Sequence, residues 1–141
     1  MDRSASAVWQ GTLKEGKGTI SMQSGTLKDA QYSFAARFAE GVGTNPEELI
    51  AAAHAGCFTM ALSAQLTTAG FNPSKIETSA VVTLDLHGEA PTITKIHLTN
   101  TSSVPGIDKA KFDELAKKAK EGCPVSRVLK AAEITLDAKL V

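Results

Sequence analysis

The sequence lacks an excess of charge of either sign. Fifteen Lys and Arg residues balance fifteen Asp and Glu residues over 141 positions, and no run of like charge exceeds two residues. Proteins that bind phosphate backbones or anionic lipids present clustered basic side chains, which this sequence does not supply. We therefore predict that neither nucleic acid nor a membrane surface is a partner.

A long uninterrupted apolar run is also missing. Residues 1–10 contain no stretch of signal-peptide type, and polar residues interrupt the least polar segment, residues 49–66. Both observations favour a cytoplasmic protein. With 141 residues, of which 43% are hydrophobic, the chain fits one domain spanning residues 1–141 with a core of moderate size.

Cysteine is scarce, because only Cys57 and Cys123 are present. A structural disulfide is not expected in a reducing compartment, so the two thiols are either inert buried residues or transiently oxidised ones. Cys57 follows four alanines and a glycine within residues 51–56, interrupted only by His54. Helix propensity alone does not require so many small residues, so this run predicts another backbone packing closely against it.

The two cysteines occupy different local environments. Cys123 directly precedes Pro124, at the start of a short helical pattern, where the helix dipole favours a thiolate. Cys57 lies in the middle of a predicted helix, where burial raises the pKa of a thiol. A reactive Cys57 would therefore need a cation from elsewhere, and taken alone this residue is typical of a packing residue.

Other polar residues also have two interpretations each. His54, three residues before Cys57, could form a Cys–His pair, but a core histidine bonded to backbone is the simpler interpretation. Arg37 could be a surface arginine on a strand, and Glu47 could simply cap a helix. The remaining two histidines, His87 and His97, are expected to be solvated, and they lack metal-ligand spacing with either cysteine.

Hydrophobic periodicity predicts an α+β fold. Alternation of period two predicts strands over residues 4–13, 19–23, 31–38, 78–86, 93–99 and 134–140, and Arg37 would point away from the aromatic face of its strand. Helices are predicted over residues 46–70, capped by Thr44 or Asn45, over residues 109–122, capped by Asp108, and over residues 124–130. This order of elements favours antiparallel sheets.

Four segments together resemble the OsmC/Ohr family, and specifically its OsmC branch. They are residues 43–49 (GTNPEEL), 51–58 (AAAHAGCF) with 61–62, 104–107 (VPGI), and 122–126 (GCPVS) with Leu129. The similarity covers nearly the whole chain. It implies an intertwined α/β homodimer with sheets around a long central helix. It also implies a cofactor-free thiol peroxidase that prefers organic hydroperoxides.

The resemblance assigns roles to four residues. Cys57 matches the attacking cysteine, Cys123 the resolving cysteine, Arg37 the arginine and Glu47 the carboxylate. The implied cycle forms a sulfenic acid on Cys57 and then a Cys57–Cys123 disulfide, which an external dithiol or a lipoylated protein reduces. Arg37 would lower the pKa of Cys57, and Glu47 would hold the guanidinium.

The spacing of these residues adds a hypothesis about assembly. Glu47 and Cys57 are ten residues apart on one predicted helix, about 15 Å at 1.5 Å rise per residue, so each site would be shared between two subunits. Phe58 and Met60 would line an apolar pocket for alkyl or acyl peroxides. The alternatives are a non-enzymatic redox sensor or hydrophobic-ligand-binding dimer, and a purely structural role for both cysteines.

Overall fold

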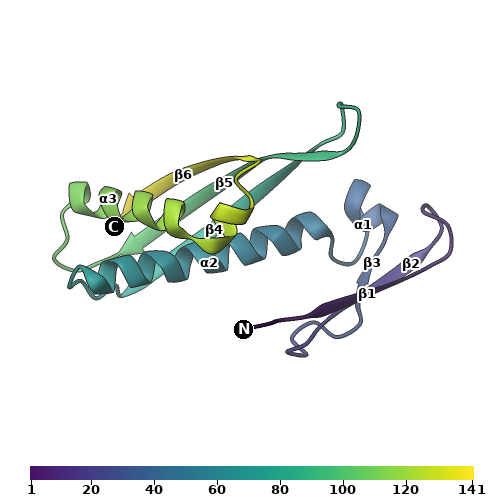
Figure 1. The fold of residues 1–141 in the computed structure, drawn as a ribbon, viewed down its shortest axis with the longest axis horizontal. Coiled ribbons are helices and arrows are strands. Elements are labelled where there is room, and N and C mark those ends of the chain that lie inside the picture. The colour runs from purple at the N-terminus through teal and green to yellow at the C-terminus, as the bar shows by residue number, and fades with distance from the viewer. The chain divides into compact units, whose positions relative to one another are not determined.

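The computed structural model describes all 141 residues, which form two compact units, Met1–Leu49 and Ile50–Val141. Helix α2 (Pro46–Thr68) runs through the boundary between them. The single domain expected over residues 1–141 stays a prediction. The presence of helices together with two separate three-stranded sheets confirms the α+β class (Figure 1).

The first unit is built on a small antiparallel sheet. Its strands β1 (Ala5–Gln10), β2 (Lys17–Met22) and β3 (Ala30–Tyr32) pair in that order. Trp9 and Tyr32 meet on this sheet, with ring centroids 5.3 Å apart. Gly18 lies beside both rings, and a Cβ at this position would come within 2.2 Å of the Tyr32 ring. Only glycine therefore allows the two aromatic rings to close over β2.

Helix α1 (Phe34–Phe38) replaces the second half of the strand predicted over residues 31–38. The Ser33 hydroxyl accepts a hydrogen bond from the Ala36 backbone N–H at 3.1 Å and caps the helix. Phe34 and Phe38, four residues apart, have ring centroids 4.9 Å apart. The expectation that Arg37 lies on a strand and points away from the aromatic face is wrong, because its guanidinium lies 5.1 Å from the Phe38 ring centroid.

Helix α2 has the predicted ends. Asn45 is the N-cap, since its side-chain oxygen accepts a 2.9 Å hydrogen bond from the Glu48 N–H. Gly70 follows the last turn with φ 86°, and the Phe71 N–H returns to the Leu66 carbonyl at 3.0 Å. This left-handed glycine ends the helix in the usual way.

The second unit contains a mixed sheet in which β5 (Thr92–Ser103) lies between β4 (Lys75–Asp85) and β6 (Glu133–Leu140). The β4–β5 hairpin is antiparallel, as predicted. The β5–β6 pair is parallel, which corrects the expectation of purely antiparallel sheets. The chain crosses from β5 to β6 through α3 (Lys109–Gly122) and α4 (Pro124–Val128). Such a helical crossover brings the next strand back in the same direction.

The hydrophobic core of the second unit lies between α2, α3 and this sheet. Helix α3 contributes four buried apolar residues at helical spacing, and its predicted cap Asp108 accepts a hydrogen bond from the Lys111 N–H at 2.8 Å. Strand β6 turns its alternate apolar residues toward the same cluster. The buried members of this cluster are Phe58, Leu62, Leu66, Leu98, Val104, Ile107, Phe112, Leu115, Ala116 and Ala119.

A chain of polar side chains crosses the interface between α2 and the sheet. The Thr59 hydroxyl donates to the Thr78 hydroxyl on β4 at 2.8 Å. The amide of Asn100, which is 1% exposed, donates to the same Thr78 oxygen at 2.9 Å and to the Glu77 carbonyl at 3.0 Å. Ser102 completes the network through the Asn100 side-chain oxygen at 2.8 Å. These buried polar groups therefore have partners, as buried polar groups require.

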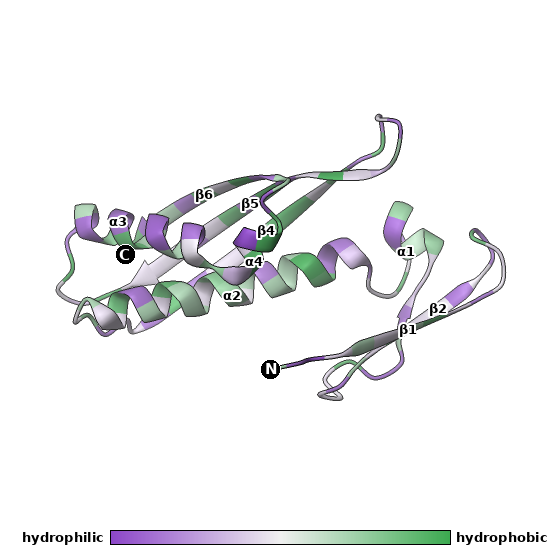
Figure 2. Ribbon diagram, viewed as in Figure 1, coloured by the Kyte–Doolittle hydropathy of each residue, from purple (hydrophilic) through white to green (hydrophobic).

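The opposite side of α2 has no partner within the second unit. Ala53, Gly56, Met60 and Ala64 are exposed at helical spacing, and a Cβ built on Gly56 meets no atom within 4 Å. Figure 2 shows apolar or weakly polar residues along most of α2. By length and composition alone this helix could span a membrane, with a mean hydropathy of 1.4. Its inner side chains, however, belong to a packed core of helices and strands.

Candidate active site

The two cysteines meet in the second unit. Cys57 comes from the middle of α2 and Cys123 from the junction of α3 and α4, and their sulfur atoms lie 2.7 Å apart without a disulfide. Cys123 is fully buried, whereas Cys57 is half-buried. The Cys57 sulfur is therefore accessible to a small molecule, and the Cys123 sulfur is already in contact with the Cys57 sulfur.

Neutral surroundings oppose ionisation of Cys57. Burial raises the pKa of the Cys57 thiol, and the hydrogen bond with Cys123 raises it further. The backbone N–H of Val125, in the first turn of α4, acts in the opposite direction. These groups of the second unit include no cation, so a reactive Cys57 thiolate needs a positive charge that they do not provide.

Cys123 has the predicted position at a helix start. Its sulfur accepts a hydrogen bond from the Ser126 backbone N–H at 3.5 Å, and Pro124 occupies the first turn of α4. Its own backbone N–H closes α3 through the Ala119 carbonyl at 2.9 Å. The residue therefore ends one helix and starts the next, which fixes its backbone on both sides.

His54 is a core histidine, as the simpler interpretation predicts, but its partner is a side chain. Its Nε2 lies 2.7 Å from the Ser126 hydroxyl, whereas no hydrogen bond joins it to Cys57. Burial lowers the pKa of His54, which keeps the imidazole neutral at pH 7. His97, expected to be solvated, is half-buried, and its Nδ1 lies 2.6 Å from the Thr135 hydroxyl.

Arg37 and Glu47 form a forked ion pair in the first unit. The Arg37 Nε donates to both Glu47 carboxylate oxygens at 3.2 Å, and Nη2 donates to Oε1 at 2.8 Å. The side chains are 35% and 13% exposed, respectively. Such bidentate geometry holds a guanidinium plane in one orientation. The structure thus brings together the arginine and the carboxylate that the resemblance paired.

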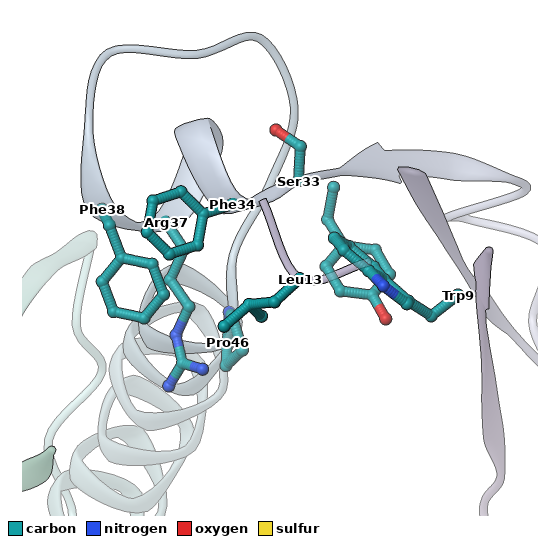
Figure 3. Close-up of a pocket in the computed structure, with 8 residues that line it drawn as sticks. Trp9, Leu13, Ser33, Phe34, Arg37, Phe38 and Pro46 are labelled. Carbon is teal, nitrogen blue, oxygen red and sulfur yellow. The ribbon is translucent and has the colours of Figure 1, made fainter. Parts of the chain in front are cut away.

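An aromatic pocket of about 230 Å³ lies beside Arg37. Figure 3 shows the Phe34 and Phe38 rings next to the arginine side chain, with Leu13, Trp9 and Ser33 along the same hollow; Tyr32 and Pro46 complete its lining. Sequence reasoning placed the apolar pocket elsewhere, at Phe58 and Met60. In this chain Phe58 is fully buried in the core and Met60 is 76% exposed on α2, and the pocket expected at these residues stays a prediction.

Known proteins resemble the chain over most of its length. The family model described as OsmC-like protein matches residues 39–139. The sequence is 56% identical over 134 residues to peroxiredoxin OsmC of Escherichia coli (strain K12), covering 95% of this chain and 93% of that protein. It is 34% identical over 102 residues to an organic hydroperoxide resistance protein of Xanthomonas axonopodis pv. citri (strain 306), covering 70% of this chain and 68% of that protein.

A solved structure agrees with these sequence matches. The organic hydroperoxide resistance protein OhrB of Bacillus subtilis superimposes with a TM-score of 0.63 at 26% identity, covering 98% of each chain. The fold, the family model and the extended sequence identity all point to one group of proteins. The chain belongs to the OsmC/Ohr family, on its OsmC branch.

Proposed function

We propose that this chain is a peroxidase that reduces organic hydroperoxides, and hydrogen peroxide more weakly, through Cys57 and Cys123. The contact between the two sulfur atoms, 2.7 Å apart, is the observation that carries the proposal. Relatives named peroxiredoxin and organic hydroperoxide resistance protein support a peroxidase-type function. The forked Arg37–Glu47 pair supports the same function, because it presents an oriented cation.

The proposed reaction needs the two cysteines, the Arg37–Glu47 pair and an external reductant. The Cys57 thiolate attacks one peroxide oxygen, the O–O bond breaks, and the alcohol leaves after protonation of the alkoxide. The sulfenic acid on Cys57 then condenses with the Cys123 thiol to form a disulfide and water. A dithiol, free or carried on a lipoylated protein, reduces this disulfide and closes the cycle. No cofactor takes part.

Arg37 supplies the charge that Cys57 lacks. Its guanidinium would lower the pKa of the Cys57 thiol and stabilise the leaving alkoxide, while Glu47 holds its orientation. The aromatic pocket beside Arg37 would receive the apolar part of the peroxide, such as an alkyl or fatty-acyl chain. Pocket and cation adjoin each other, which favours organic peroxides over hydrogen peroxide.

Each active site is shared between two subunits of a homodimer. Ten residues of α2 separate Glu47 from Cys57, about 15 Å along the helix axis, which is too far for one small site. The exposed small side chains of α2, Ala53, Gly56 and Ala64, allow a second copy of the helix to pack closely. Such packing would cover these exposed residues of α2 and bring Glu47 of one subunit toward Cys57 of the other.

Steady-state turnover tests the proposed function. With dithiothreitol present, the protein is expected to consume many equivalents of cumene hydroperoxide per dimer, and to use hydrogen peroxide with lower kcat/KM, because only the organic peroxide fills the aromatic pocket. A redox sensor or ligand-binding dimer would stop near one equivalent. Equal kcat/KM for the two peroxides would contradict the pocket assignment.

Mixing two inactive variants tests the shared site. A Cys57→Ser chain paired with an Arg37→Met chain would contain one site with both residues intact only if the site is built from two subunits. We then expect about a quarter of the parent activity per chain, since half of randomly paired dimers are mixed and each has one intact site.

The control for this mixture is each variant exchanged with itself, which should keep only the residual activity of that variant, about a hundredth of the parent or less. Subunit exchange is verified by a mass tag on one variant and isolation of the mixed dimer. A purified mixed dimer without activity would place Arg37 and Cys57 of each site in the same chain.

A further inference from the structure

One buried polar group has no part in the reaction described above. The His54 side chain is 0% exposed, its Nε2 contacts the Ser126 hydroxyl at 2.7 Å, and its Nδ1 is buried without any partner. Leaving a buried polar atom unpaired is unfavourable, and an aliphatic side chain would avoid this penalty. Stability alone therefore does not explain the imidazole, and its one hydrogen bond is the feature to explain.

That hydrogen bond leads directly to the sulfur pair. Ser126 lies three residues after Cys123, and its backbone N–H donates to the Cys123 sulfur at 3.5 Å. His54 lies three residues before Cys57 on α2. Helix α2 is thus joined to the start of α4 at two points about one turn apart. His54 contacts Ser126, and Cys57 contacts Cys123.

The short helix α4 depends on such an external attachment. It has five residues, Pro124–Val128, and its Val128 is 76% exposed. A helix of this length has little stability of its own and keeps its position through tertiary contacts. Ser126–His54 is the only hydrogen bond between a side chain of α4 and a side chain of α2, and the Val125 backbone N–H adds a contact to the Cys57 sulfur.

We propose that His54 and Ser126 form a positioning pair that holds α4 on α2, so that Cys123 captures the Cys57 sulfenic acid before a second peroxide reaches it. The inference rests on the proposed peroxidase function. In the capture, the Cys123 sulfur attacks the Cys57 sulfur, the S–S bond forms, the S–O bond breaks, and the hydroxyl leaves as water with the thiol proton.

The competing reaction is overoxidation. A second hydroperoxide transfers one oxygen atom to the sulfenic acid, which becomes a sulfinic acid, and the peroxide is reduced to its alcohol. Disulfide formation and overoxidation both follow the first peroxide attack. The positioning pair therefore changes how the sulfenic acid is divided between the two products, while the first step continues as before.

Rapid-quench intact mass separates these steps. The reduced protein is mixed with cumene hydroperoxide at several concentrations, quenched with a thiol-blocking reagent, and analysed for sulfenic, disulfide and sulfinic forms. In Ser126→Ala, we expect disulfide formation to slow about tenfold, the equivalent of one lost buried hydrogen bond. The first-turnover consumption of peroxide should change by less than about twofold, since the first step makes no use of Ser126.

Two further variants make the result specific. His54→Gln should keep most of the parent rate of disulfide formation, because the glutamine amide can reach Ser126 with an N–H donor in place of Nε2. Ser102→Ala is the matched control, since it removes another buried serine hydroxyl, bonded to Asn100, in the same unit. The control should leave the ratio of sulfinic acid to disulfide unchanged, and thermal unfolding verifies that each variant is folded.

Three results would overturn the positioning pair. These are a Ser126→Ala variant with the parent rate of disulfide formation, an equal shift in Ser102→Ala, or a first step slowed as much as the second. In all three the parent still forms its disulfide, so the proposed function stands. A parent protein that forms no disulfide after peroxide treatment would overturn both proposals.

Discussion

Replacing Cys57 with serine is expected to lower peroxide reduction by roughly 10³-fold or more, as for loss of an attacking nucleophile in other enzymes. A serine hydroxyl is not ionised at neutral pH and does not form the oxidised sulfur states of the cycle. The measurement is consumption of cumene hydroperoxide with dithiothreitol, together with intact mass after one equivalent of peroxide. The parent should lose two hydrogen atoms as the disulfide forms, and Cys57→Ser should keep its mass.

Cys123→Ser is the matched variant, because it also replaces one sulfur of the pair by oxygen. It should react with the first equivalent of peroxide and then accumulate a sulfenic acid on Cys57, since no thiol stands in contact with it. Together the two variants distinguish attack from resolution. Equal oxidation of both variants would mean that either sulfur can attack, and oxidation of Cys57→Ser alone would reverse the two assignments.

Removing the guanidinium of Arg37 is the second change with a large expected effect. Arg37→Met should lower the second-order rate constant with cumene hydroperoxide by about 10²-fold, a typical loss for one charge-stabilising group. It should also shift alkylation of Cys57 by iodoacetamide to higher pH, because burial and Cys123 already raise the pKa of this thiol and the opposing cation would be gone.

Glu47→Gln and Arg3→Met are the comparisons for this experiment. Glu47→Gln keeps the positive charge and loses its ionic partner, so a smaller decrease of about tenfold is expected. Arg3 is exposed near the N-terminus and is not part of the Arg37–Glu47 pair. Its replacement removes a guanidinium that has no role in the proposed site. A parent-like alkylation profile in Arg37→Met would show that another group ionises Cys57.

Much of the fold could be predicted because its elements carry unambiguous local signals. Asn45 and Asp108 cap helices α2 and α3, and their side chains accept the expected backbone N–H groups. The strand predicted over residues 31–38 is wrong in its second half for a physical reason. Phe34 and Phe38 satisfy both a strand period of two and a helical spacing of four, and the Ser33 cap decides between them.

The direction of β6 could not be predicted from its own residues. Alternation at Ile134, Leu136 and Ala138 fixes which face is buried, but it is identical for parallel and antiparallel pairing. The α3–α4 crossover is the informative feature, because a connection of this length commonly returns to a parallel neighbour. The length of this connection therefore carries the information on direction that the residues of β6 lack.

The candidate site could be predicted in part. Both cysteines and the Arg37–Glu47 pair follow from the family resemblance, and the structure adds the distances within each pair. The partnership of His54 with Ser126 joins residues 72 positions apart, so no local pattern reports it. The aromatic pocket likewise gathers residues from three segments, among them Trp9 and Phe34, each of which reads alone as an ordinary core residue.

The polar chain from Thr59 through Thr78 to Asn100 determines where α2 packs along the sheet during folding. A helix with apolar side chains on nearly every face could settle one turn up or down with similar hydrophobic gain. Only one seating gives Thr59, Thr78 and Asn100 their partners, and any slip leaves these groups dry and unpaired. These hydrogen bonds therefore fix the position of α2, and with it that of Cys57, relative to the strands of the sheet.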